Sequence, residues 1–426
     1  MGIILHKEDA FIREHLMEGM VGLELESLRT DREGNLSKKP HPFPDNPVID
    51  RDFGEAQIEI GTAPEASLDK AVDDLRKYLG ITQARLKETG ELLWPFSNPP
   101  VIRSEEDIKV ADFRGERRKK TLYREYLAGK YGKYKMSFSG IHFNYSFSPE
   151  LISRNYMLDS AGELRKYTDH FYLNLAQRVL EYSWMIVALL GASPVVDSSF
   201  YIKGLSGKTI FTGKSSLRCS ESGYWNTFVP YIDYGSIEGY SDSIRSYVRN
   251  GMLNSESELY YPVRIKNAGE YSLERLEETG ADHIELRMID LNPFSDFGID
   301  QRDAAFLKLF LIWLSAMETD PMDAAGQVQA IQNIKAAAAY DLDITKIFLM
   351  NGKGLSVRAA LESCLIEMIR FFEMDYPEAG KVLYFQMEKL KNEKNRYADR
   401  VLNCFGDQYI ERGVKRAEEI QEAMYV

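Results

Sequence analysis

Four segments that lie far apart in this sequence alternate apolar residues with charged or polar ones. They are GLELES from residue 22, DFGEAQIEI from 52, SGIHFNYSF from 139 and HIELRMID from 283. Because successive side chains of a strand point to opposite faces, each segment predicts a strand with one apolar and one polar face. This alternation is typical of an antiparallel sheet that is covered on one side only.

The polar face of the expected sheet is unusually acidic. It would carry Glu24, Glu26, Glu55, Gln57, Glu59, His142, Asn144, Glu285 and Arg287. A polar face that simply meets solvent is the common alternative. Carboxylates this close repel one another unless cations lie between them, and a hard cation such as Mg²⁺ or Mn²⁺ would also recruit phosphate oxygens. The pattern therefore suggests phosphoryl transfer on a metal–nucleotide platform.

Helical periodicity accounts for most of the remaining chain. Apolar residues recur at helical spacing from Leu68 to Leu86, between an N-cap candidate at Ser67 and a terminating Gly90. Other helices are expected over about 160–190, from Asp300 onward, and over about 356–374, 378–398 and 406–424. We therefore predict an α+β fold, with a catalytic body over residues 1–320 and a helical C-terminal portion of the same domain over 321–426.

The balance of charges limits the choice of partners. The chain has 53 Lys and Arg against 65 Asp and Glu, for a formal charge of −12, which argues against nucleic acid or an anionic membrane. The three cysteines are widely spaced and predict neither a disulfide scaffold nor a zinc site. The start lacks a signal-peptide apolar core, and no apolar run is long enough to span a bilayer. We expect a soluble cytoplasmic protein with small-molecule partners, and the sequence leaves its oligomeric state open.

Two short segments imitate the end of a phosphate-binding P-loop. They are Gly207-Lys208-Thr209 and Gly213-Lys214-Ser215, but the glycine required five residues earlier is Ile202 in one and Lys208 in the other. No G-x-G-x-x-G segment occurs either. A nucleotide is therefore expected to be held through carboxylate-bound metal ions.

A series of ordered blocks resembles the bacterial glutamate–cysteine ligases, also called γ-glutamylcysteine synthetases. The blocks include GLELESLRTDREGNLSKKPHP, LWPFSNP, KTLYREYLAGKYG, SLRCSESGY, ELYYPVR and IELRMIDLNPFSDFGID, and they run from about residue 22 to 320. The resemblance implies the glutamine-synthetase-like catalytic fold, a curved and mainly antiparallel sheet whose concave face binds ATP through metal ions. It also implies the ATP-dependent joining of the γ-carboxyl of L-glutamate to the amine of L-cysteine through a γ-glutamyl phosphate, the first step of glutathione biosynthesis.

The resemblance also implies a role for particular residues. The expected ligands of Mg²⁺ or Mn²⁺ are Glu24, Glu26, Asp52, Glu59, His142 and Glu285. Arg287, with Glu285 beside it, matches the catalytic arginine that contacts the transferred phosphoryl group, and Arg218 matches the arginine that positions glutamate. The residues expected around the acceptor amino acid are Tyr123, Arg124, Leu127, Met136, Tyr224, Tyr260 and Arg264.

One departure from the family pattern keeps other functions open. Position 136 is Met where the family has Gln beside the acceptor pocket, so a γ-glutamyl ligase for a different amine is an alternative. A non-catalytic relative that binds glutamate or nucleotide is a second alternative, although every expected catalytic position is occupied. No ATP-grasp module follows in this sequence, so we expect the chain to catalyse only the first step.

Overall fold

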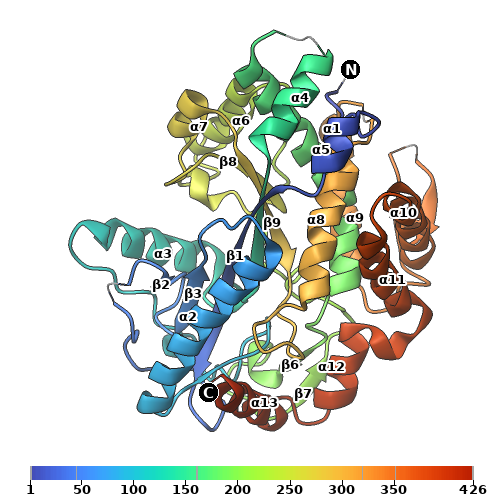
Figure 1. Cartoon of the computed structure of the whole chain (residues 1–426). Coiled ribbons are helices and arrows are strands. Elements are labelled where there is room, and N and C mark those ends of the chain that lie inside the picture. Colours follow the sequence, from blue (N-terminus) through green and yellow to red (C-terminus); the bar gives the residue numbers. More distant parts are fainter. Residues whose placement is uncertain (1, 45, 160–161, 319, 351, 425–426) are drawn as a thin grey trace.

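The computed structural model describes residues 2–44, 46–159, 162–318, 320–350 and 352–424, and its fold is the predicted α+β fold (Figure 1). The strands are β1 (Gly19–Thr30), β2 (Ile49–Asp50), β3 (Gln57–Gly61), β4 (Leu92–Leu93), β5 (Ile141–Phe147), β6 (Val195–Asp197), β7 (Thr209–Phe211), β8 (Val263–Lys266), β9 (His283–Ile289), β10 (Lys346–Phe348) and β11 (Gly354–Ser356). The helices are α1 (Ala10–His15), α2 (Leu68–Thr89), α3 (Arg118–Tyr131), α4 (Pro149–Asp159), α5 (Leu164–Leu190), α6 (Ile237–Arg249), α7 (Leu273–Thr279), α8 (Gln301–Ser315), α9 (Ala324–Ala337), α10 (Val357–Phe372), α11 (Pro377–Lys391), α12 (Tyr397–Phe405) and α13 (Tyr409–Ala423).

The main sheet brings the four predicted strands side by side. Its order is β2-β3-β1-β5-β9-β8, every pair is antiparallel, and β4 pairs with the end of β1. The register sets Glu26 opposite Glu59 and Glu24 opposite His142. Directly paired residues of an antiparallel sheet share a face, so the polar residues of strands far apart in sequence meet on one face.

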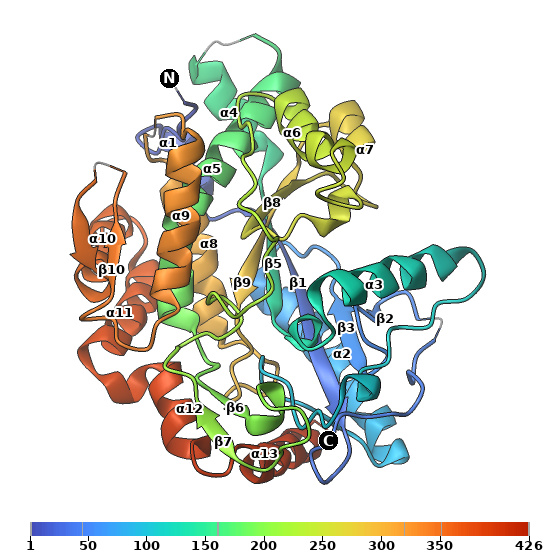
Figure 2. The ribbon, with the colours of Figure 1, turned by 180° about the vertical axis from the view of Figure 1, so that it is seen from behind.

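The apolar face of the sheet packs against helices and forms the core. Leu23, Ile60, Phe143 and Leu286 are at most 1% exposed. Contacts from α2, α5 and α8 cover this face, and Figure 1 shows α2 in front of the strands and α8 beside β9. Seen from behind in Figure 2, β1, β5 and β9 lie between α3 on one side and α9 on the other. The sheet therefore presents its polar face on the side away from α2 and α8.

Helix ends follow their capping residues. The Ser67 side chain accepts from the Lys70 N–H at the start of α2, and Gly90 ends that helix with φ 71°, a left-handed conformation that glycine adopts without strain. Asp300 caps α8 in the same way through the Arg302 N–H. The prediction of one helix over 378–398 is wrong, because α11 ends at Lys391 and α12 begins at Tyr397.

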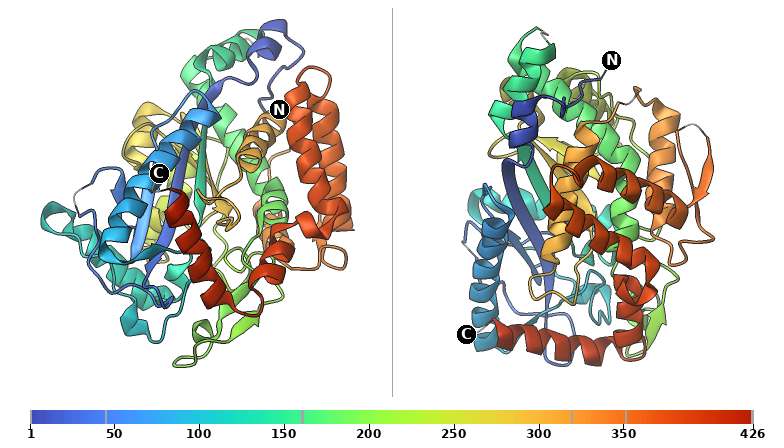
Figure 3. Two further views of the ribbon diagram at one scale, coloured as in Figure 1. Left: turned by 60° about the horizontal axis from the view of Figure 1, so that its bottom comes forward. Right: turned by 45° about the vertical axis from the view of Figure 1, so that its right-hand side comes forward.

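The C-terminal helices close the base of the molecule. In Figure 3 the last helix runs along the bottom of the right-hand view, toward the end of the sheet. Its first residue, Tyr409, packs edge-on against Trp94 and Phe96, with ring centroids 5.4 and 5.0 Å away. None of the described helices is both long and apolar enough to cross a membrane.

Candidate active site

Four carboxylates and an imidazole gather on the polar face of the sheet. The Nδ1 atom of His142 lies 2.6 Å from Glu24 Oε1 and 3.9 Å from Glu285 Oε1, while its Nε2 lies 3.7 Å from Glu26 Oε1. Glu24, Glu26 and His142 each offer one possible metal-ligand atom, and these three atoms lie within 4.8 Å of one another. Glu59 is set directly across from Glu26 by the pairing of β1 with β3. The sheet register thus assembles most of the predicted metal-ligand set.

The carboxylates of this face fall into two electrostatic groups. Burial, together with the charge of Asp52, raises the pKa of Glu26 well above its usual value. The pKa of Glu59 is raised in the same way, by burial and by the charge of Glu24. Burial also acts on Glu285, but the charges of Arg287 and Lys266 outweigh it and hold the pKa of Glu285 well below its usual value. Glu285 is therefore paired directly with two positive side chains, whereas Glu26 and Glu59 form no ion pair with a lysine or an arginine in the described part of the chain.

The donor set fits a hard divalent cation. Carboxylate oxygens suit Mg²⁺ and Mn²⁺, and an imidazole nitrogen is acceptable to Mn²⁺. His142 is 2% exposed, and its Nε2 has no hydrogen-bond partner among the described residues. Asp52 lies at the edge of the group, with its Oδ1 3.8 Å from Arg124 Nη2. A cation between Glu26 and Glu59 would offset their mutual repulsion and desolvation.

The raised carboxyl pKa values predict how pH affects metal-dependent stability. Above the ordinary carboxyl pKa, folded Glu26 and Glu59 retain protons that the unfolded chain has lost, so without metal they reduce stability as pH rises toward their raised pKa values. A bound cation favours the ionised forms and removes this loss. We expect the gap in melting temperature between protein with Mn²⁺ and protein with a chelator to widen from pH 5 to 8. A constant gap would contradict this assignment.

Beside the acidic face lies a pocket built from residues of several segments. Its walls include Arg218, Tyr224, Tyr260 and Arg287. The rings of Tyr224 and Tyr260 meet edge to face, 4.8 Å apart. Arg218 is buried and donates from Nη1 to the Ile289 carbonyl at 3.1 Å. The pocket therefore holds two guanidinium groups and an aromatic wall.

Gly140 is needed for the position of Arg218. A Cβ atom at residue 140 would lie 2.5 Å from the Arg218 Cζ, which is closer than real contacts allow. The guanidinium therefore packs directly on the backbone that leads into β5. This packing orients Arg218 toward the pocket that it shares with Arg287.

The other residues predicted around the acceptor lie behind or beside the aromatic wall. Leu127 and Met136 are buried in one hydrophobic cluster, with Tyr123, Tyr224 and Tyr260 packed against it. Arg264 donates from Nη2 to the carbonyls of Ser257 and Leu259, so it holds the loop that carries Tyr260. Arg124 donates to the carbonyls of Asp52 and Lys120. Arg264 and Arg124 therefore support neighbouring segments through backbone contacts.

Comparison with known proteins identifies the family. The sequence model of the family described as glutamate-cysteine ligase matches residues 5–337, more than half of the chain. The chain belongs to the glutamate–cysteine ligase family. It is 35% identical to the glutathione biosynthesis bifunctional protein GshAB of Listeria monocytogenes, a match that covers 93% of this chain and 53% of that protein. It is 34% identical to a glutamate–cysteine ligase of Clostridium acetobutylicum, covering 74% of this chain and 75% of that protein. The chain thus spans about half the length of the bifunctional relatives it matches.

Solved structures of the family share the fold. A glutamate–cysteine ligase from Francisella tularensis, determined in complex with AMP, superposes with a TM-score of 0.86 at 22% identity, over 96% of this chain and 89% of that one. A bifunctional glutathione synthetase from Pasteurella multocida superposes with a TM-score of 0.85 at 27% identity, over 99% of this chain and 55% of that one. The predicted antiparallel sheet and helical C-terminal portion are therefore confirmed as features of this ligase family.

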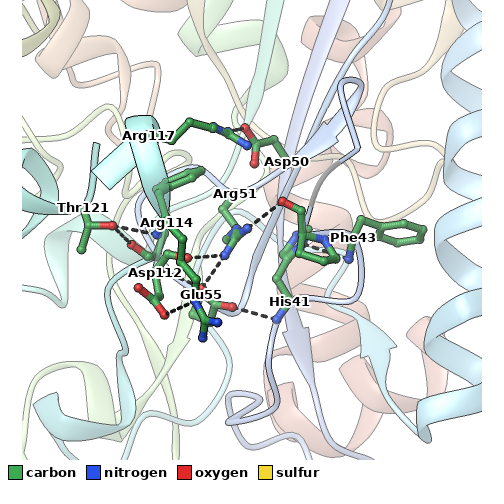
Figure 4. Close-up of polar contacts among 12 residues, drawn as sticks. His41, Phe43, Asp50, Arg51, Glu55, Asp112, Arg114, Arg117 and Thr121 are labelled. Atoms are coloured by element: carbon green, nitrogen blue, oxygen red, sulfur yellow. Dashed lines mark hydrogen bonds and ion pairs between the residues drawn. The ribbon is translucent and has the colours of Figure 1, made fainter. Parts of the chain in front are cut away.

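The prediction that Glu55 shares the acidic face is wrong. The strand begins only at Gln57, and Glu55 lies in the preceding turn. Figure 4 shows its carboxylate between Arg51, the His41 N–H and the Asp112 N–H, at 3.3, 2.8 and 3.0 Å. Glu55 is therefore a structural residue at a corner of the sheet.

The basic segment 114–120 belongs to this same corner. Arg117 forms an ion pair with Asp50 and stacks on the Phe113 ring, with its Cζ 4.5 Å from the centroid (Figure 4). Arg114 lies 3.5 Å from Asp112. The two P-loop imitations are also structural: the Gly207 N–H donates to Asp197, and Lys214 pairs with Glu221.

Lys266 is a residue of the site that the sequence did not predict. Its Nζ lies 2.7 Å from Glu285 Oε1. The alternation of the VRIK segment that forms β8 places Lys266 on the same face as Arg264, which pairs with Glu285 in the register. The alternation in this segment indicates Lys266, but a pattern of only four residues is too short to predict a strand by itself.

Proposed function

We propose that this protein is an ATP-dependent ligase that joins the γ-carboxyl of L-glutamate to the amine of L-cysteine. The products are γ-glutamylcysteine, ADP and phosphate, in the first step of glutathione biosynthesis. The observation that carries the proposal is the position of Arg287: it pairs with Glu285 on the acidic face and also lines the pocket that contains Arg218. A metal–nucleotide site and an amino-acid site would thus meet at one guanidinium.

The acidic face would hold the nucleotide. Divalent cations bound by Glu24, Glu26, Asp52, Glu59, His142 and Glu285 would neutralise the phosphates of ATP. Arg287 is fixed by the bond from its Nη1 to Glu285 Oε2 at 2.8 Å, which leaves its other donors for the transferred phosphoryl group. These donors would stabilise the negative charge of the equatorial oxygens during transfer.

The pocket would hold both amino acids. Arg218 has the planar fork of donors that binds a carboxylate bidentately, so we assign it to L-glutamate. In the first step the γ-carboxylate oxygen attacks the γ-phosphorus and ADP leaves. In the second step the acceptor amine attacks the acyl carbon of γ-glutamyl phosphate, phosphate leaves, and the amine loses a proton. Tyr224 and Tyr260 would hold the acceptor for this attack.

The acceptor is assigned to L-cysteine because the wall of its pocket is aromatic and apolar. Met136 is 7% exposed and packs with Leu127 behind the tyrosines, so it adds apolar volume at this point. A thiol side chain is small and only weakly hydrogen-bonding, which suits such a wall. The same burial of Met136 favours, as a second candidate function, a γ-glutamyl ligase for another small apolar amine.

The test of the function is ATP turnover with identification of the product. Purified protein with Mg²⁺, ATP and L-glutamate is assayed with L-cysteine and with a panel of other small amines, and the products are identified by mass spectrometry. Cysteine-dependent phosphate release with γ-glutamylcysteine would support the main proposal. Preference for another amine would support the second candidate, and an absence of turnover with every amine would reject both.

Replacing Glu59 by Gln is expected to raise the Mg²⁺ concentration needed for half-maximal activity by about tenfold or more, because a ligand charge opposite Glu26 is lost. The measurement is a Mg²⁺ titration of turnover. Glu88→Gln is the matched control, since Glu88 lies on the exposed side of α2 and pairs with Arg85. Superimposable titrations of Glu59→Gln and wild type would exclude Glu59 as a ligand.

We place the chemistry in residues 1–320 and give 321–426 a supporting role. In support, Arg416 of α13 donates to the Pro293 carbonyl and to Asp296, both at 2.7 Å, within the segment that follows β9.

The reaction would take place in the cytoplasm, a reducing compartment where unpaired cysteines such as Cys219, Cys364 and Cys404 persist.

A further inference from the structure

Both carboxylate oxygens of Glu285 are bound by cations of the protein itself. Oε1 lies 2.7 Å from Lys266 Nζ, and Oε2 lies 2.8 Å from Arg287 Nη1. Glu285 is fully buried, so these bonds replace the water that an exposed carboxylate would have. A metal ion that uses Glu285 as a ligand must therefore compete with two resident positive charges for the carboxylate oxygens.

The carboxylates at the other side of the acidic face have no such partner. Within the described ranges, neither Glu26 nor Glu59 forms an ion pair with a lysine or an arginine. His142 lies 3.7 Å from Glu26, and the charges of Arg218 and Arg287 act on Glu26 from beyond ion-pair distance. The two residues face each other across β1 and β3. A cation that approaches this pair therefore has no resident positive group to displace.

Of the two cations paired with Glu285, Lys266 is the one that a metal ion can displace more easily. It is the last residue of β8, and β8 is an edge strand of the sheet. Its side chain is 20% exposed and ends in a compact, strongly hydrated ammonium on four flexible carbons. Arg287 lies on β9, between β5 and β8, and its planar guanidinium is fixed by the geometry of its bond to Glu285. Lys266 can swing toward solvent or toward a phosphate without disturbing the sheet.

We propose that Lys266 is a resident counter-ion that Glu285 exchanges for a divalent metal ion. The acidic face then has two unequal metal positions: an open one at Glu26 and Glu59, and one at Glu285, where Lys266 competes with the metal ion. The phosphates of a bound nucleotide offer the displaced ammonium a new partner, so they favour metal binding at Glu285. This inference rests on the metal–nucleotide platform of the proposed function, within which Lys266 is a positioning residue.

The test is calorimetric titration of Mn²⁺ into the metal-free protein without nucleotide. For wild type we expect one tighter and one weaker class of sites. In Lys266→Met and Lys266→Gln the weaker class should tighten by about tenfold, because a competing positive charge is removed from a buried carboxylate. Lys266→Arg keeps the charge and should bind like wild type. Lys214→Met, which removes a lysine from the surface pair with Glu221, is the matched control and should also bind like wild type.

A second titration adds a non-hydrolysable ATP analogue. The difference between wild type and Lys266→Met should become smaller, because the phosphates draw the ammonium away in the wild-type protein. Unchanged Mn²⁺ isotherms for both neutral variants would overturn the proposal, as would weaker binding in both classes together with a lower melting temperature. Because metal binding is read without turnover, wild type that binds Mn²⁺ in two classes but forms no γ-glutamylcysteine would reject the proposed function and leave this inference standing.

Discussion

Replacing Arg287 by Ala is expected to lower kcat by about 10²-fold or more and to change the affinity for ATP little. The reason is that the arginine lies where the acidic face meets the pocket, is held by Glu285 and is only 16% exposed. Its charge matters most when negative charge spreads over the transferred phosphoryl oxygens. ATP in the ground state is held mainly by the proposed metal ions, so its binding is largely preserved.

Turnover and nucleotide binding are therefore measured separately for this variant. The kcat comes from cysteine-dependent phosphate release, and ATP affinity comes from calorimetry with Mg²⁺ present. Arg287→Lys keeps the charge but not the planar fork, so it should recover only part of the rate. Arg302→Ala, on α8 where Arg302 pairs with Asp300, is the control for loss of an arginine elsewhere. Near-normal turnover of Arg287→Ala would remove this residue from the mechanism.

The strands of the active site could be predicted because their pattern is local. Period-two alternation in GLELES and IHFNYSF fixes which side chains share a face, whatever the neighbouring strand is. The register is not local: that Glu24 meets His142 depends on pairing between segments about 120 residues apart. Without the register, the sequence predicts an acidic face but not its division into a side paired with Lys266 and Arg287 and a side where Glu26 and Glu59 form no ion pair with a described lysine or arginine.

The errors arose where a boundary depends on one residue's contacts. Glu55 continues the alternation of β3 in the sequence, yet it lies in the turn before the strand because Arg51 and two backbone N–H groups bind its carboxylate. The helix expected over 378–398 ends early because Asn392 leaves the helical conformation, and its side chain accepts from the Lys394 N–H. Asparagine often competes with the helix in this way, but the sequence alone does not say when it succeeds.

The C-terminal helices contain a buried ion pair with a large expected effect on stability. Asp303 of α8 accepts from Lys389 of α11 at 2.6 Å, from Gln386 at 2.8 Å and from the Tyr397 hydroxyl at 2.6 Å. Lys389 and Asp303 are each 1% exposed. Since α8, α11 and α12 all contribute, one carboxylate joins the last helix of the catalytic body to the C-terminal portion.

Replacing Asp303 by Ala is expected to lower the free energy of unfolding by about 3–5 kcal/mol, because Lys389 would remain buried without a counter-charge. The measurement is denaturant unfolding followed by circular dichroism. Glu378→Ala breaks the exposed Lys381–Glu378 pair on α11 and should have no measurable effect, since surface pairs contribute little.

A double variant separates the cost of the unpaired charge from the loss of packing. Asp303→Ala with Lys389→Met removes both charges, so it should be more stable than Asp303→Ala alone. If the double variant is no more stable than the single one, the buried charge is not the cause and lost contacts to Tyr397 and Gln386 are. The distinction bears on function, because α8 supports the sheet. If the charge pair determines stability, α8 needs Lys389 of α11 in order to fold. If only packing contacts matter, we expect the acidic face and the pocket to stay formed when α11 packs less tightly.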